Sequence, residues 1–143
     1  MGISRRDWTL LIPALTAATA AAQEQAATGL PSKVYHADTI SYGGDDKKKG
    51  RRFLRGAEHS GFTFEVHETV LGPGMETHAP HKHEHEEFVI LVEGMVEAFL
   101  DGKTERVEPG SVVYFGSNRM HNLRNAGAGP CRYYVIELRG KAA

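Results

Sequence analysis

Apolar and polar side chains alternate in short stretches along the chain, and this pattern indicates β-strands. In residues 61–71, Phe62 and Phe64 alternate with Thr63 and Glu65, which is the two-residue period of a strand with one buried face. Comparable runs rich in β-branched and aromatic residues predict further strands at residues 34–42, 87–93, 95–100, 103–107, 111–115 and 131–138. We therefore expect an all-β protein.

Residues that favour turns separate these runs. The strongest signals are Asp101-Gly102, which predicts a hairpin, and Pro109-Gly110, which predicts the next turn. The chain has 143 residues, a length that suits one domain with its own core. Short strands at regular spacing within one domain indicate a barrel or a sandwich.

Charge and cysteine content narrow the possible functions. The formal net charge of -1 gives no electrostatic reason to expect nucleic acid as a partner. Cys131 is the only cysteine, so no internal disulfide can form, and we expect a buried, unreactive thiol. A basic run at residues 47–55 is expected to be a solvated loop, with anion binding as the alternative.

The first 22 residues have the features of an export signal. Arg5 and Arg6 form a basic start, residues 8–22 are uncharged, and small residues at 20–22 offer a cleavage site. The arginine pair and its neighbours resemble the twin-arginine consensus of bacterial signal peptides, although Trp8 replaces the usual Phe. A general secretory signal is the alternative.

These features predict the organisation of the chain. We expect a signal peptide at residues 1–22, a flexible mature N-terminus at residues 23–33 and a β-barrel domain at residues 34–140. The apolar part of the signal is short for a membrane span, which needs about 20 residues. We therefore expect an exported, periplasmic protein with no membrane segment after removal of the signal.

Three histidines and three glutamates crowd into residues 81–87, in front of an apolar strand. Their nitrogen and oxygen atoms are ligands for divalent transition metals, so a metal site is the first hypothesis and a charged, exposed turn the alternative. In an extended chain His81 and His83 share a face and can reach one ion. A straight strand would put Glu87 roughly 20 Å from His81. The chain must therefore turn between them, and we expect His85 to lie solvent-exposed in that turn.

The spacing of these residues resembles the first sequence motif of the cupin superfamily, G-x5-H-x-H-x3/4-E-x6-G. The match runs from His81 to Gly94, and Gly74 lies one residue further away than the motif requires. The second motif, G-x5-P-x-G-x2-H-x3-N, is matched in spacing by Gly110, Gly116, Asn118, His121 and Asn125. Gly116 stands at the proline position and Asn118 at the second glycine position, and both are turn-forming residues.

The resemblance implies a single-domain cupin jelly-roll β-barrel, also called a double-stranded β-helix, with one divalent transition metal. Carried over residue by residue, it implies that the metal ligands are His81, His83, Glu87 and His121. Such a set leaves two positions open on an octahedral ion, as a catalytic site requires. For Asn125 the commoner role of asparagine is to cap a turn.

Cupin barrels host many activities, so the function is less determined than the fold. The leading hypothesis is an oxygen-using oxidase or dioxygenase that acts on a small organic molecule, with Fe or Mn favoured over Zn, Ni or Cu. The alternatives are a non-enzymatic periplasmic protein that binds a metal or small ligand, and a non-redox Zn or Ni isomerase or lyase. His78, His67 and Glu137 are candidate acid–base residues. A homodimer is expected from the resemblance.

Overall fold

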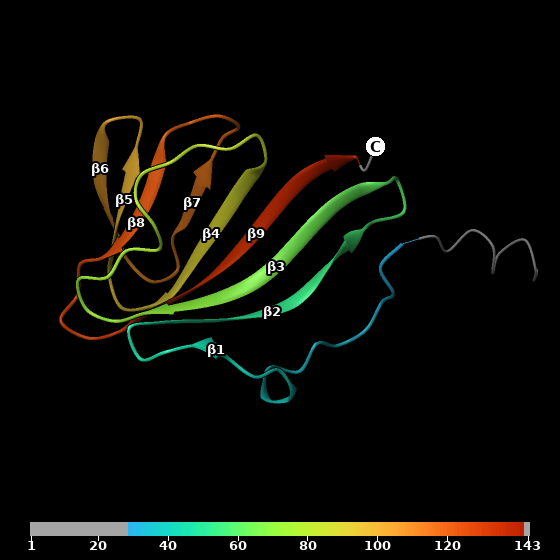
Figure 1. Ribbon diagram of the computed structural model, residues 1–143, viewed down its shortest axis with the longest axis horizontal. Coiled ribbons are helices and arrows are strands. Elements are labelled where there is room, and N and C mark those ends of the chain that lie inside the picture. The colour runs from blue at the N-terminus through green and yellow to red at the C-terminus, as the bar shows by residue number, and fades with distance from the viewer. Residues whose placement is uncertain (1–28, 142–143) are drawn as a thin grey trace, which may run out of the picture.

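The computed structural model describes residues 29–141, so the predicted signal peptide and the first part of the predicted flexible N-terminus lie outside the described residues. Within this range the chain forms one short 3-10 helix, η1, and nine strands (Figure 1). Their bounds are η1 Ala37–Thr39, β1 Gly43–Gly44, β2 Lys48–Ala57, β3 Phe62–Leu71, β4 Glu86–Glu93, β5 Val96–Leu100, β6 Lys103–Val107, β7 Val112–Phe115, β8 His121–Asn125 and β9 Cys131–Lys141. The prediction of an all-β protein is confirmed.

The strands form two antiparallel sheets. The larger sheet has the order β1-β2-β3-β9-β4-β7, and the smaller has the order β6-β5-β8. Figure 1 shows that β2, β3 and β9 are long and curved and run past the smaller sheet. Two antiparallel sheets with this crossing connectivity form the expected jelly-roll.

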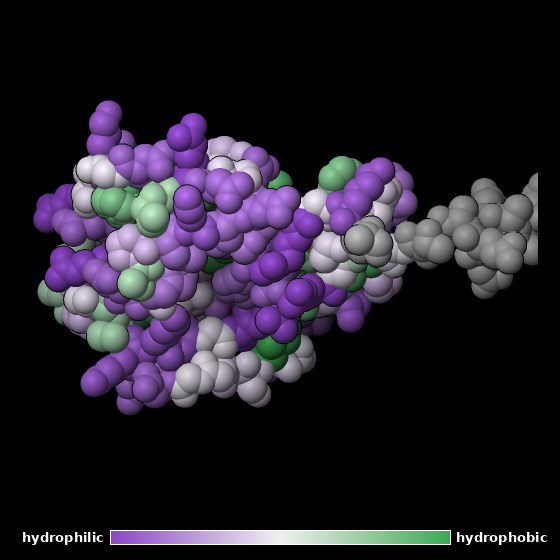
Figure 2. Space-filling model, turned by 45° about the horizontal axis from the view of Figure 1, so that its top comes forward, coloured by the Kyte–Doolittle hydropathy of each residue, from purple (hydrophilic) through white to green (hydrophobic). Residues whose placement is uncertain are grey.

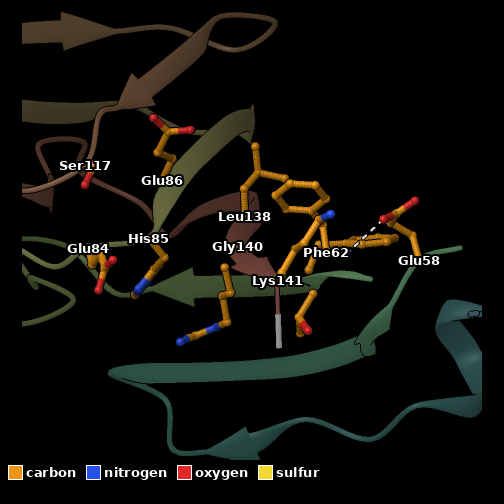
Figure 3. Close-up of a pocket in the computed structure, with 12 residues that line it drawn as sticks. Glu58, Phe62, Glu84, His85, Glu86, Ser117, Leu138, Gly140 and Lys141 are labelled. Atoms are coloured by element: carbon orange, nitrogen blue, oxygen red, sulfur yellow. Dashed lines mark hydrogen bonds between the residues drawn. The ribbon is translucent and has the colours of Figure 1, made fainter. Parts of the chain in front are cut away.

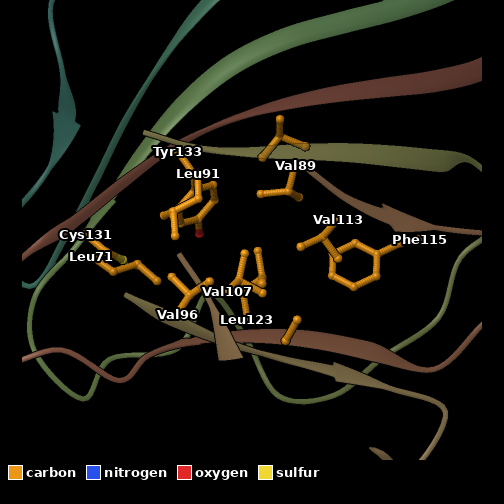
Figure 4. Close-up of a cluster of buried hydrophobic side chains, with 12 residues drawn as sticks. Leu71, Val89, Leu91, Val96, Val107, Val113, Phe115, Leu123, Cys131 and Tyr133 are labelled. Atoms are coloured by element: carbon orange, nitrogen blue, oxygen red, sulfur yellow. The ribbon is translucent and has the colours of Figure 1, made fainter. Parts of the chain in front are cut away.

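The core lies between the two sheets and takes every second residue from their strands. β4 contributes Val89 and Leu91, and β5 contributes Val96 and Ala98, all of them buried (Figure 4). The buried apolar set is Leu71, Val89, Leu91, Val96, Ala98, Val107, Val113, Phe115, Leu123, Cys131, Tyr133 and Val135. Cys131 is fully buried, as predicted, and burial raises the pKa of its thiol to about 11.

The prediction of a strand at residues 34–42 is wrong. This segment contains η1, and β1 is confined to Gly43–Gly44. The guanidinium of Arg51 donates hydrogen bonds to two carbonyl oxygens of the segment, those of Ala37 and Ile40. These carbonyl groups are therefore satisfied by a side chain instead of by a neighbouring strand.

The basic run is a strand and not the expected loop. β2 pairs with β3 from end to end, with one irregularity between Arg52 and Leu54. Its charged residues point to both faces of the sheet: Arg51 lies opposite Glu68, and Arg52 lies opposite His67. The run lacks the apolar alternation that marks a half-buried strand. It can form a strand nevertheless, because carboxylates on β3 compensate its charges.

Glu68 shows how the outer face accommodates these charges. Its side chain is fully buried and accepts hydrogen bonds from the hydroxyl of Tyr42 at 2.8 Å and from the guanidinium groups of Arg51 and Arg132. Burial opposes ionisation of Glu68, but these hydrogen bonds together lower its pKa. The cluster fastens the segment before β2 to the sheet.

The face of the molecule seen in Figure 2 is mostly hydrophilic, with small separate apolar areas. Among residues 29–141, no helix has the length and apolar character needed to cross a membrane.

Candidate metal centre

Two segments that are far apart in the sequence meet at one end of the barrel. His81 and His121 form an antiparallel bridge in which each backbone N–H donates to the carbonyl oxygen of the other residue, at 3.1 and 2.8 Å. His121 is the first residue of β8, a strand that the sequence did not predict. The bridge places the two imidazole rings 4.6 Å apart between centroids.

A bend at Glu84 and His85 separates His83 from the start of β4. The ring Nδ1–H of His83 donates to the carbonyl oxygen of His85 at 2.7 Å. The backbone N–H of Asn118 donates to the carbonyl oxygen of His83, also at 2.7 Å. The chain therefore turns between His83 and Glu87, as the sequence predicts.

The three imidazoles converge. The ring of His83 lies 5.1 Å from that of His81 and 4.7 Å from that of His121, measured between centroids. Each of these residues offers one ring nitrogen, and the three nitrogens lie within 4.8 Å of one another. One ion could therefore contact all three.

The hydrogen bonds of two rings leave a lone pair directed at the centre. His121 donates from Nδ1 to the carbonyl oxygen of Arg119 at 2.8 Å, as His83 does to His85. Among the described residues, the buried Nε2 atoms of His83 and His121 have no hydrogen-bond partner. A ring whose Nδ1 carries the proton presents Nε2 as a metal ligand. Burial lowers the pKa of His121, which favours the neutral imidazole.

Glu87 brings a carboxylate to the same point. Its Oε1 atom is 3.1 Å from Nε2 of His83, and its Oε2 atom is 3.9 Å from Nε2 of His121. A buried nitrogen without a partner is unfavourable, and a cation bound between these atoms would satisfy both rings and the carboxylate. Two overlapping groups could hold an ion, His81 with His83 and His121, and His83 with His85 and Glu87, so imidazoles and one carboxylate that fit a divalent ion meet at His83.

The prediction that His85 is solvent-exposed is wrong. Its side chain is only 17% exposed and stacks on the ring of His83, with 3.5 Å between centroids. Its Nε2 atom is 3.1 Å from Oε1 of Glu87 and 3.8 Å from Oε2 of Glu137. β4 begins at Glu86, so His85 and Glu87 lie on the same face of the chain and both point into the barrel. Burial lowers the pKa of His85, and the neighbouring His83 lowers it further.

The structure places the three candidate acid–base residues around this centre. His67 and Glu137 face the interior, where Nδ1 of His67 is 4.0 Å from Oε1 of Glu137. His67 also lies 3.3 Å from Oε1 of Glu65, a buried carboxylate that was not identified from the sequence. The two-residue period that places His67 inside places Glu65 there as well. His78 lies at the rim and packs edge-on against His81, and burial lowers its pKa.

Space for a ligand lies next to these residues. A cavity of about 90 Å³ is lined by Glu87, His121 and Tyr133, among others. The hydroxyl of Tyr133 is buried and has no hydrogen-bond partner among the described residues. A larger groove of about 830 Å³ is lined by His85 and Arg139, where β9 continues beyond the start of β4 (Figure 3). The two spaces have no lining residue in common, but Arg139 of the groove forms an ion pair with Glu137 of the cavity.

Asn125 is the last residue of β8, and its hydrogen bonds join neighbouring segments at that end of the barrel. Its Nδ2 atom donates to the carbonyl oxygens of Leu71 and Gly129, each at 2.9 Å. Its Oδ1 atom accepts from the backbone N–H of Gly127 at 2.9 Å. This last contact is the turn cap expected from the sequence, and the other two join β3, β8 and the loop before β9.

Comparison with known proteins agrees with this architecture. Residues 67–137 match the family model described as the cupin domain. With the jelly-roll fold, this match supports assignment of the protein to the cupin superfamily. Cupin domains commonly bind a divalent metal, and the histidine and glutamate groups described above could hold one.

Two curated relatives are similar in sequence to part of the chain. It is 40% identical over 75 residues to the L-ectoine synthases of Bordetella parapertussis and Bordetella bronchiseptica. The alignment covers 51% of this chain and 55% of each relative, so the chain spans about half the length of the curated relatives it matches.

Solved structures show the same fold at low sequence identity. KdgF from Halomonas sp. has a TM-score of 0.65 at 15% identity, with 76% of this chain and 96% of that chain covered. The polyketide cyclase RemF from Streptomyces resistomycificus has a TM-score of 0.60 at 21% identity, with coverage of 80% and 83%. These similarities concern the fold.

Proposed function

We propose that the domain is a metal-dependent enzyme that acts on a small organic molecule. The observation that carries the proposal is the convergence of two buried, unpartnered ring nitrogens, those of His83 and His121, on the carboxylate of Glu87. His81 and these three residues would hold the ion. A divalent metal in this position supplies a Lewis acid that polarises a substrate oxygen.

Side chains beside the centre are suited to move protons. The side chain of Glu137 is 11% exposed, lines the cavity and lies 3.8 Å from the ring of His85. Its carboxylate contacts the guanidinium of Arg139 and lines the cavity, where it can accept a proton from a substrate. The hydroxyl of Tyr133 can donate a hydrogen bond to a substrate oxygen, and burial raises its pKa so that it stays protonated.

These proton-transferring groups favour non-redox chemistry, such as an elimination, cyclisation or isomerisation. The names of two similar proteins, a synthase and a polyketide cyclase, support this class. An oxygen-using oxidase or dioxygenase with Fe or Mn is the second candidate. The observation that favours it is the ligand set itself, because four protein ligands leave two positions of an octahedral ion for substrate and oxygen.

The test begins with elemental analysis of untagged protein. The metal-loaded protein is then incubated with small hydroxy acids, amino acids and phenols under air and under argon, and products are followed by mass spectrometry. Glu137→Gln tests the proton acceptor, and Glu105→Gln, at an exposed position of β6, is its matched control. We expect full metal content in both variants, and loss of turnover in Glu137→Gln alone.

The outcomes separate the candidate functions. Product formation under argon supports the non-redox enzyme, whereas turnover that requires air and consumes oxygen supports the oxidase or dioxygenase. Full metal occupancy without turnover of any compound would show a non-enzymatic metal- or ligand-binding cupin. Absence of bound metal in the purified wild-type protein would overturn the proposal.

A further inference from the structure

Three arginines lie on the inner face of the larger sheet, next to the buried carboxylates of Glu65 and Glu137. Arg52 lies opposite His67, and Arg55 lies opposite Glu65, in the pairing of β2 with β3. Directly opposite residues of antiparallel strands share a face, so both arginines lie on the inner side of the sheet. Arg139 lies on the same side of the sheet, since it forms an ion pair with Glu137 on β9. We call Arg52, Arg55 and Arg139 the arginine cluster.

Each guanidinium of the cluster uses one nitrogen for its ion pair. Arg52 and Arg55 contact the carboxylate of Glu65 through Nε, at 2.9 and 3.6 Å, and Arg139 contacts Glu137 through one terminal nitrogen. Within the described part of the chain, their other nitrogens make no further ion pair or side-chain hydrogen bond.

The arginines are also the accessible partners in these pairs. The side chains of Arg52, Arg55 and Arg139 are 58%, 51% and 33% exposed. The side chains of Glu65 and Glu137 are 6% and 11% exposed. The unused donors therefore remain open to a ligand, while the carboxylates are covered.

The charge on this inner surface favours an anion. The three guanidinium groups of the cluster balance three inward carboxylates, those of Glu65, Glu87 and Glu137. On this inner face a divalent ion at the metal centre would leave two positive charges uncompensated, while the groove beyond it also carries Glu58, Glu84, Glu86 and Lys141. A second cation at Glu65, His67 and Glu137 is disfavoured, although their atoms are close enough, because three guanidinium groups already accompany two carboxylates.

We propose that the arginine cluster binds the carboxylate of the substrate, so that the enzyme acts on small organic acids that also carry an oxygen or nitrogen ligand for the metal. This inference rests on the proposed metal-dependent function and specifies its substrate class. The planar guanidinium fork matches a carboxylate, and charge-assisted pairs of this kind are strong.

Neighbouring side chains connect the arginine cluster with the metal centre. Arg139 lines the groove of about 830 Å³, and its partner Glu137 lines the cavity of about 90 Å³ at the metal centre. The ring of His85 lies between Glu137 and Glu87, at 3.8 and 3.1 Å from their oxygens. Glu137 and His85 therefore link Arg139 to the carboxylate of Glu87, and the proposal places a short molecule along this path.

Dicarboxylates and their uncharged analogues test this inference. Malonate, succinate and glutarate, and the corresponding diamides, are titrated calorimetrically into metal-loaded protein at fixed ionic strength. We expect at least one dicarboxylate to bind about tenfold or more tightly than its diamide. Arg139→Gln and Arg52→Gln should each weaken that dicarboxylate about tenfold or more and leave the diamide unchanged, because a hydrogen bond to a charged group is lost.

Arg106→Gln is the matched control, since Arg106 is 70% exposed on β6, in the other sheet. It should bind the dicarboxylate as the wild-type protein does. Circular dichroism and metal content identify a variant that fails to fold, and Arg55→Gln then takes its place.

The outcomes distinguish this inference from the proposed function. If the wild-type protein retains no metal, both fall. If it retains metal but binds dicarboxylate and diamide equally, or if the cluster variants bind dicarboxylate like the wild-type protein, only the arginine site is refuted. An equal loss in Arg106→Gln would also refute it, because the effect would then reflect overall charge.

Discussion

His85 is the residue whose role the structure changes most, and its replacement gives a quantitative prediction. In His85→Ala, the metal should still bind but more weakly. The ring of His85 contacts Oε1 of Glu87 at 3.1 Å and stacks on His83, so it orients two proposed ligands without being one of the four itself. Loss of such a supporting contact typically weakens metal binding about 10–100-fold.

The expected weakening corresponds to about 1.4–2.7 kcal/mol of binding free energy, at about 1.4 kcal/mol for each factor of ten. The dissociation constant can be measured by competition with a chromogenic chelator. His59→Ala serves as the matched control, because the side chain of His59 is 88% exposed and lies outside the centre. His121→Ala, which removes a proposed ligand, should abolish metal retention.

Two results would refute this reasoning. If His85→Ala binds metal as tightly as His59→Ala, the contact with Glu87 does not orient the carboxylate. If His85→Ala loses metal as completely as His121→Ala, His85 is itself a ligand and the four-residue set is wrong.

Three further predictions concern stability and reactivity. Asn125→Ala should lower the free energy of unfolding by about 2–4 kcal/mol in urea denaturation, because three hydrogen bonds of about 1 kcal/mol each are lost and buried carbonyl groups are left unpaired; a loss under 1 kcal/mol would contradict it. Gly94→Ala should destabilise by about 2 kcal/mol or more in the same assay, since Gly94 has φ of +84° and a Cβ there would lie 2.7 Å from Cα of Cys131. The thiol of Cys131, whose pKa is raised to about 11, should resist iodoacetamide at pH 8 until denaturant is added, and rapid alkylation of the native protein would show that it is not buried.

Local patterns were sufficient for much of the fold. Strand β6 coincides with the predicted range, and β3 begins one residue later than predicted, because alternation and turn residues are properties of neighbouring positions. Strand β8 and the basic strand β2 were missed. β8 is stabilised by pairing with the distant strand β5, and the charges of β2, which pairs with its neighbour β3, conceal the two-residue period.

The candidate site, too, could be predicted only in part from the sequence. The need for a turn between His81 and Glu87 follows from the reach of the chain, and this required no knowledge of the rest of the fold. The position of His85 did not follow, because it depends on where β4 begins relative to the bend.

By itself, the sequence determined the spacing of the histidines and Glu87 and the alternation along each strand, since both depend on local chain geometry. Only the tertiary structure decided which face of each strand points inward. Alternation defines two faces but does not name the buried one, and here the polar face of β3, with Glu65 and His67, turns toward the interior. The same decision places Arg52 on the inner face with His67 and Arg51 on the opposite face with Glu68, because only the pairing of β2 with β3 assigns their sides.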